Sequence, residues 1–190
     1  MSRIIISSLI ILFHLQAWST PIVQKSQTFY GIKGDNENEL RNQLNSLGPV
    51  IKNKRFDAQT TWHISWTYSW QAPNSSDESC TLKNAQVTIT IEQLLPQWLD
   101  QASGSLVLQA KWNNYMAALL KHEQLHESNG MEAAQEIEAA LLKIPPKDSC
   151  PDLANAVETT ANAILQQHNI SDQKIDIDSN YGLLMGASFP

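Results

Sequence analysis

The chain has few cysteines, no cluster of basic residues and no long apolar run beyond its first residues. It has 2 cysteines in 190 residues, and its formal net charge is −6. Because an acidic chain without a basic patch binds poorly to nucleic acid and to anionic membrane surfaces, we predict neither partner. No internal repeat, low-complexity tract or Pro/Gly-rich linker divides the sequence, which predicts a single domain.

The N-terminus carries the most apolar stretch. Arg3 precedes an apolar run over residues 4–13, and Ala17-Trp18-Ser19 has the small-x-small ending that signal peptidase accepts. This run is shorter than the ~20 residues that span a bilayer. We therefore predict a signal peptide over residues 1–19 and one secreted or periplasmic domain over residues 20–190, without stable membrane insertion. An uncleaved signal anchor is the alternative.

The two cysteines, Cys80 and Cys150, both lie in polar surroundings that are typical of loops. In an oxidising compartment we expect them to pair. Such a disulfide closes a loop of about 70 residues and stabilises the fold by roughly 4 kcal/mol on the chain-entropy model. A Cys/Cys/His metal site is the alternative, but the sequence lacks the C-x-x-C spacing that such sites use.

Hydrophobic periodicity predicts a β-α opening followed by two paired strands. Residues 28–32 have the pattern of a strand, and Asp35 offers an N-cap for a helix that ends at Gly48-Pro49. Residues 62–70 and 87–91 alternate strictly, which predicts an antiparallel pair with a long connection. The first of these strands places large side chains on one face, which helices must cover: Trp62, Ile64, Trp66, Tyr68 and Trp70.

The second half of the chain is predicted to be mainly helical. Pro96 favours a turn or a helix start, and a long helix follows from about residue 106 to 144. Gly130 either ends or bends this helix, or is tolerated within it. A further helix is predicted over residues 151–168, and residues 170–190 show no strong periodicity.

Within the long helix, His122, Glu123 and His126 form an H-E-x-x-H pattern. Residues four apart project from one helical face, so both imidazoles can reach a single metal ion with Glu123 beside them. The pattern predicts Zn²⁺ held by the two histidines, with Glu123 as general base toward a zinc-activated water that hydrolyses a peptide bond. Satisfied helical histidines beside a surface glutamate are the alternative, but a metal accounts for all three residues at once.

A catalytic zinc normally has three protein ligands, and spacing does not identify the third. Glu132 follows on the same helix but faces elsewhere unless Gly130 turns the chain back. No H-x-x-G-x-x-H extension is present, so the metzincin arrangement is absent. Downstream, Glu158 resembles the glutamate of the gluzincin arrangement, and the other polar candidates are His168, Asp176, Asp178 and Tyr181.

Several short motifs occur in an order and spacing that resembles a known family. They are Trp66 in its aromatic strand, Cys80, Leu95-Pro96-x-Trp98, Trp112-x-x-Tyr115 before the H-E-x-x-H pattern, Cys150, and Gly186-Ala187-x-Phe189-Pro190. The chain resembles the bacterial predicted secreted zinc-dependent proteases grouped as domain of unknown function 922. The resemblance implies a zincin-like arrangement, with the motif helix beneath the sheet, and a peptide or protein substrate bound along a sheet edge.

The sequence departs from the family pattern near its end. The family tends to have Tyr-Asp-x-x-Thr-x-His-Gly, and this chain has Ile175 in place of Tyr and Tyr181 in place of His, whereas Asp176 matches. If that histidine is the third ligand, Tyr181 coordinates as a phenolate, donates a hydrogen bond to the oxyanion, or leaves the metal with two protein ligands. Asp176 is then a candidate third ligand or a partner of a histidine.

We predict a secreted α+β domain in which a small, mainly antiparallel sheet packs on the long motif helix and on a C-terminal helix. Its predicted function is that of a zinc metallopeptidase with His122 and His126 as ligands and Glu123 as base. The alternatives are a periplasmic binding or assembly protein that holds zinc without turnover, and a structural module that holds no metal.

Overall fold

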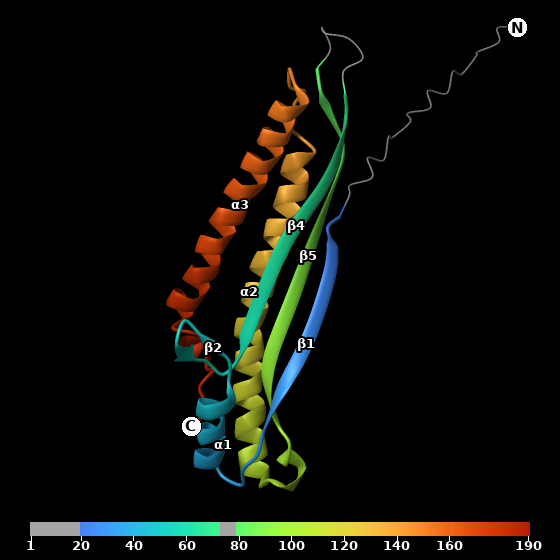
Figure 1. Ribbon diagram of the computed structural model, residues 1–190. Helices are drawn as coiled ribbons and strands as arrows, with labels where there is room; N and C mark the ends of the chain where they lie inside the picture. The colour runs from blue at the N-terminus through green and yellow to red at the C-terminus, as the bar shows by residue number, and fades with distance from the viewer. Residues whose placement is uncertain (1–19, 73–78) are drawn as a thin grey trace, which may run out of the picture.

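The computed structural model describes residues 20–72 and 79–190, so the predicted signal peptide at residues 1–19 lies outside the described residues. The described chain is α+β, with three α-helices, two short 3-10 helices (Gln101–Ser103 and Leu183–Met185) and a small mixed sheet (Figure 1). In chain order the elements are β1 (Ile22–Ile32), α1 (Glu37–Leu47), β2 (Val50–Ile51), β3 (Lys54–Arg55), β4 (Gln59–Gln71), β5 (Thr81–Trp98), α2 (Leu106–Leu141) and α3 (Cys150–Ser179). Within these ranges no helix is both long enough and apolar enough to cross a bilayer.

The main sheet has the strand order β1-β5-β4. β4 and β5 pair antiparallel, which confirms the predicted pair, but β5 pairs parallel with β1. The prediction of a mainly antiparallel sheet is therefore corrected to a mixed one. The physical reason is that α1 and the short β2–β3 hairpin separate β1 from β4, so the chain enters β4 from the opposite direction and β5 fits between the two (Figure 1).

β5 continues as a strand through Pro96, where the sequence predicted a turn or a helix start. The pairing of β4 with β5 begins at the couple Gln59 and Leu94, so Pro96 lies beyond the reach of β4 and faces only Tyr30 of β1. Proline lacks an N–H donor, but at this point one side of β5 is unpaired and needs none. The pairing with β1 therefore outweighs the preference of Pro96 for a turn or a helix start.

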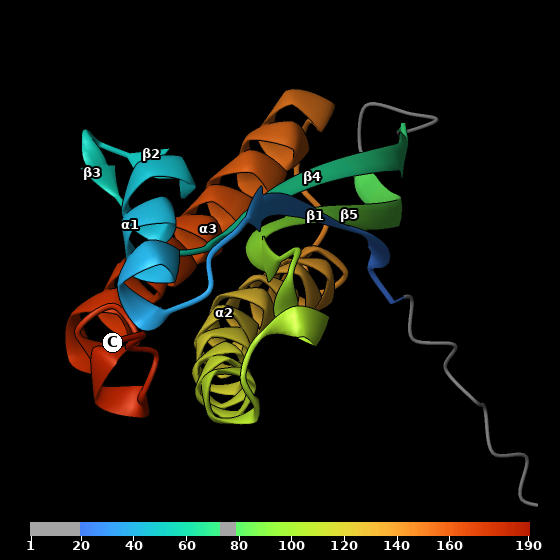
Figure 2. The same ribbon diagram turned by 90° about the horizontal axis from the view of Figure 1, so that it is seen from below.

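Helices cover most of the aromatic face of β4, as predicted, but Trp70 near its end is 44 % exposed. Ile64 is buried against α2 and α3 in an apolar cluster, and Trp62, Trp66 and Tyr68 pack around it. α2 lies across one face of the sheet, and α3 runs back along α2 in the opposite direction (Figures 1 and 2). A second cluster lies at the other end of α2 and includes Ile32, Leu95, Trp98, Trp112, Tyr115 and Phe189.

Cys80 and Cys150 form a disulfide, with Cα atoms 5.1 Å apart. This confirms the predicted pair. The disulfide joins the beginning of β5 to the first turn of α3, and backbone hydrogen bonds between Cys80 and Lys147 run in both directions beside it. The two elements are thus tied together at the end of the molecule where α2 turns into α3.

α2 passes through Gly130 without interruption. The glycine has a packing role, because a Cβ atom there would lie 2.7 Å from the ring of Trp62. Helix α3 is longer than predicted and extends to Ser179, so the absence of periodicity over residues 170–179 was misleading. The buried positions in this half of α3 are His168 and Ser179, and a search for apolar periodicity does not detect polar residues.

The predicted helix over α1 is confirmed, with its N-cap one residue later than expected. The side chain of Asn36, rather than Asp35, accepts a hydrogen bond from the backbone N–H of Glu39. Leu40 and Leu44 are buried, and Gly48 ends the helix as predicted.

Candidate metal centre

Three side chains from two helices converge at one point between α2 and α3. His122 and His126 lie one turn apart on α2, and Asp176 lies near the end of α3. The Nε2 atoms of the two histidines are 3.3 Å apart. Oδ1 of Asp176 lies 3.3 Å from Nε2 of His122 and 3.2 Å from Nε2 of His126.

These three distances suit a tetrahedral metal. Zinc binds histidine nitrogen and carboxylate oxygen at about 2.0–2.1 Å, so two ligand atoms at tetrahedral angles are separated by about 3.3–3.4 Å. The observed triangle has edges of 3.2–3.3 Å. The three residues therefore fit three ligand positions of one zinc ion.

Hydrogen bonds on the other ring nitrogens orient both histidines. Nδ1 of His126 lies 3.0 Å from Oδ1 of Asp172, an oxygen that can only accept when ionised. Nδ1 of His122 lies 3.3 Å from the hydroxyl of Ser179, which already donates its hydrogen to the carbonyl of Ile175 at 2.7 Å. Both Nδ1 atoms are therefore donors, and the lone pair of each Nε2 is free to bind a metal.

The electrostatics of the cluster favour a positive charge between these groups. Burial on its own raises the pKa of Asp176, but the polar contacts and the charge of the adjacent rings of His122 and His126 outweigh it and hold the pKa well below its usual range. Burial favours the neutral ring of His126, yet the carboxylates of Asp172 and Asp176 outweigh it and raise the pKa of His126 to about 10. The same carboxylates that attract a proton here also attract a metal cation.

Glu123 lies beside the cluster and is only 4 % exposed. Burial raises the pKa of its carboxyl, while a hydrogen bond from the side chain of Thr60 and the charges of His126 and His122 act in the opposite direction. A carboxylate with a raised pKa, next to a metal position, has the properties of a general base.

Gly182 closes the cluster on the α3 side. Its φ is +81°, and a Cβ atom there would lie 3.1 Å from Cγ of His122. Its backbone N–H donates to the hydroxyl of Ser179, the residue that orients His122. Both the backbone conformation and the close approach to His122 therefore require glycine at this position.

The other predicted candidates lie away from the three converging ligand atoms. The ring of Tyr181 packs on Phe56 with centroids 5.2 Å apart, and this side chain is 45 % exposed. Glu158 accepts a hydrogen bond from the indole of Trp66, Asp178 pairs with Lys174, His168 contacts Asn129 and Glu136, and Glu132 is exposed. Of the candidates downstream of the motif, Asp176 alone belongs to the cluster.

Sequence reasoning missed Asp172 and Ser179. Both contact the ring nitrogens that a metal would not use, at 3.0 Å from His126 and 3.3 Å from His122. One signal was present in the sequence, because Asp172 and Asp176 are four residues apart and project from one face of any helix that includes both. That signal depends on extending the helix beyond residue 168.

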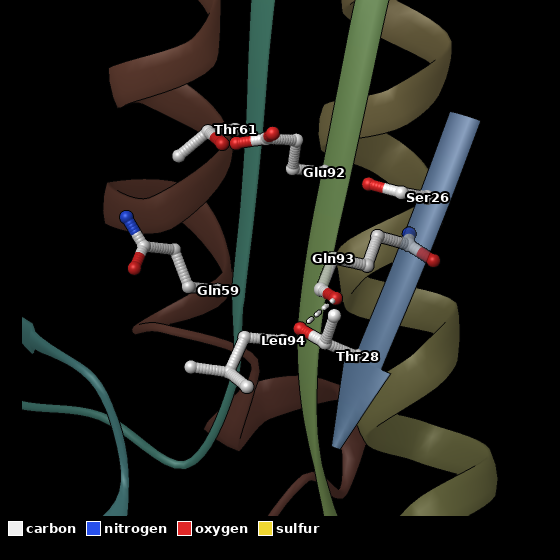
Figure 3. A pocket seen from close by; sticks show the side chains of 7 residues that line it. All are labelled: Ser26, Thr28, Gln59, Thr61, Glu92, Gln93 and Leu94. Atoms are coloured by element: carbon white, nitrogen blue, oxygen red, sulfur yellow. Dashed lines mark hydrogen bonds between the residues drawn. The ribbon is translucent and has the colours of Figure 1, made fainter. Parts of the chain in front are cut away.

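A shallow polar hollow lies on the opposite, uncovered face of the sheet. In Figure 3 the helices lie behind the strands, and short polar side chains line the hollow, among them Ser26, Thr28 and Thr61 with the carboxylate of Glu92. None of the three converging residues contributes to it. We regard this face as a solvated sheet surface.

A family model described as a bacterial protein of unknown function, DUF922, matches residues 27–182. No curated protein and no solved structure matches the chain. The matched segment includes both disulfide cysteines, the three converging residues, Glu123, Asp172 and Ser179. Since the match covers most of the sequence, the chain belongs to the DUF922 family of bacterial proteins.

Proposed function

We propose that this protein is a secreted, zinc-dependent peptidase with a zincin-like arrangement of the motif helix beneath the sheet. The observation that carries the proposal is the triangle formed by Nε2 of His122, Nε2 of His126 and Oδ1 of Asp176, with edges of 3.2–3.3 Å. Where both Nδ1 atoms are donors, the neutral rings turn the lone pairs of Nε2 toward the carboxylate of Asp176, and a divalent cation satisfies all three groups at once.

In this proposal each residue has a defined task. His122, His126 and Asp176 hold the ion, and Asp172 and Ser179 keep the two rings in the tautomer that leaves Nε2 free. When bound, zinc lowers the pKa of a coordinated water to about 7. The carboxylate of Glu123 accepts a proton from the attacking water and delivers it to the leaving amine nitrogen.

The position of β4 supports an extended peptide as the substrate. Among the described strands, β4 pairs only with β5, so its other edge carries backbone groups without a strand partner. The first residues of β4 reach the cluster, since Thr60 hydrogen-bonds to Glu123 and Trp62 donates to Asp172. An extended peptide can add to such an edge as a further strand.

A zinc-binding protein without turnover is the second candidate. The observation that favours it is Tyr181, which stands where the resemblance places a histidine and whose ring packs on Phe56 rather than joining the three ligands. In that case the centre would serve binding or assembly in the periplasm.

Zinc content and peptide hydrolysis test both candidates in the purified secreted protein. We expect about one zinc per chain, and loss of this zinc in Asp176→Asn. The control is Asp178→Asn, which removes a carboxylate from the exposed side of the same helix, where its side chain is 60 % exposed. Glu123→Gln should retain zinc and lose hydrolysis of a broad peptide library. A parent protein that holds no zinc would refute the metal centre, and one that holds zinc without hydrolysing any peptide would favour the second candidate.

A further inference from the structure

A chain of hydrogen bonds, buried at its centre, leads away from the cluster toward the surface. Starting at the outside, Oε2 of Glu136 lies 3.0 Å from Nε2 of His168, and Nδ1 of His168 lies 2.9 Å from Oδ1 of Asn129. Nδ2 of Asn129 lies 3.2 Å from Oδ1 of Asp172, which in turn contacts Nδ1 of His126 at 3.0 Å. The chain of contacts thus joins an exposed carboxylate to a proposed metal ligand.

The direction of each hydrogen bond follows from its neighbours. Nδ2 of Asn129 contacts two groups that only accept, namely the backbone carbonyl of His168 at 2.9 Å and the carboxylate of Asp172. The amide of Asn129 must therefore present its nitrogen to these two and its oxygen to the ring of His168. Because that oxygen only accepts, Nδ1 of His168 must carry a hydrogen.

From these contacts we propose that His168 and Asn129 are positioning residues for His126. The Nδ1–H of His168 fixes the orientation of the Asn129 amide, and this amide holds the carboxylate of Asp172 in the place where it accepts the Nδ1–H of His126. The indole of Trp62 donates to the same oxygen of Asp172 from the side of β4, at 3.1 Å. The inference rests on the proposed function, since it assigns these residues to the zinc site.

The geometry of the two helices explains why these residues meet. His168, Asp172 and Asp176 are spaced four apart on α3, so they share one face. That face lies against the stripe of α2 that carries His122, His126 and Asn129. A purely structural interface would need no polar residues here, because the same helices pack through Ala133 and Ala161 elsewhere.

Asn129→Asp is the sharpest variant for a test. It has the same shape as the parent residue but places a carboxylate oxygen where the nitrogen faces Asp172, so the orienting contact becomes repulsive. We expect the affinity for Zn²⁺, measured by competition with a chelator, to fall about 10- to 100-fold, the usual effect of losing a group that orients a metal ligand. His168→Leu should act in the same direction, and His168→Gln should restore part of the affinity because its amide can donate to Asn129.

Two controls separate positioning from general damage. Asn162→Asp makes the same chemical change at an exposed site on α3 and should leave the affinity unchanged. Ile137→Ala should lower the free energy of unfolding without changing the affinity, because Ile137 lies in the apolar part of the interface. Affinities equal to that of the parent in both Asn129→Asp and His168→Leu would overturn the inference.

A spectroscopic measurement on the unmodified protein tests the positioning role of His168 even if the variants fail to fold. Nitrogen-15 NMR of the histidine rings should show a hydrogen on Nδ1 of both His168 and His126 at neutral pH. A bare Nδ1 on His168 would refute the inference. If the protein held no zinc, the proposed function would fail, while the same spectrum would still report on the hydrogen-bond chain.

Discussion

Helices α2 and α3 pack against each other along two stretches of opposite character. Near the disulfide, the stretch is apolar, with Ile137 of α2 and Val157 of α3 both fully buried. Toward the other end of α3, the same two helices meet through polar side chains, with His126 and Asn129 of α2 facing Asp172 of α3.

The polar stretch would be costly without its hydrogen bonds. A buried polar group without a partner costs about 1–3 kcal/mol, whereas an apolar contact of similar volume stabilises the interface. The apolar stretch stabilises the contact between the two helices, and under the proposed function the polar stretch serves the metal centre. We infer that stability and proposed function are divided between two parts of one interface.

Removal of the disulfide should have the largest effect on the apolar stretch. In Cys80→Ser/Cys150→Ser the unfolded chain regains the freedom of a loop of 70 residues, so the free energy of unfolding should fall by about 4 kcal/mol. Urea denaturation measures this change. Zinc content should remain that of the parent wherever the variant is folded, and loss of zinc from the folded variant would show that the two stretches are not independent.

Ile137→Ala removes a buried side chain from the apolar stretch. Ile137 is 0 % exposed, and truncation of a fully buried isoleucine costs about 3 kcal/mol through lost burial and the cavity left behind. Denaturation of the variant and parent under the same conditions tests this value. A change of less than about 1 kcal/mol would mean that the stretch rearranges to fill the space.

Zinc should stabilise the protein through the polar stretch alone. At a free zinc concentration 100 times the dissociation constant, the free energy of unfolding should rise by about 2.7 kcal/mol in the parent. The Asp176→Ala variant should show no comparable rise, because a ligand is missing, whereas Asp178→Ala should respond like the parent. Equal responses in the two variants would exclude Asp176 as a ligand.

Gly130→Ala tests the border between the two stretches. The added Cβ would lie 2.7 Å from the ring of Trp62, which donates to Asp172, so the ring must move. We expect a net loss of about 1 kcal/mol, since overpacking outweighs the gain in helix propensity. Ser128→Ala, at an exposed position of the same helix, is the control, and a stabilised Gly130→Ala variant would contradict the packing role of this glycine.

Predictions based on apolar periodicity or on the two cysteines were mostly correct, including the pairing of β4 with β5, whereas those for segments with a proline or with polar inner positions were not. The helix ended by Gly48 is confirmed, and so is the strand over residues 62–70, although its pairing with β5 shifts register between Ser69 and Trp70. The strand through Pro96 was missed because it forms by pairing with β1, which lies far away in the sequence. The second half of α3 was missed because its inner positions are polar, including His168 and Ser179.

The sequence by itself determined the spacing of His122 and His126, since residues one helical turn apart share a face in any helix that contains them. It also limited any disulfide within the chain to Cys80 and Cys150, because the sequence has no other cysteine. Only the tertiary structure decided that Asp176 completes the triangle and that Asp172 and Ser179 orient the rings. The physical reason is that the packing of α2 against α3 sets the distances between their side chains. These distances cannot be read from the spacing of residues along the chain.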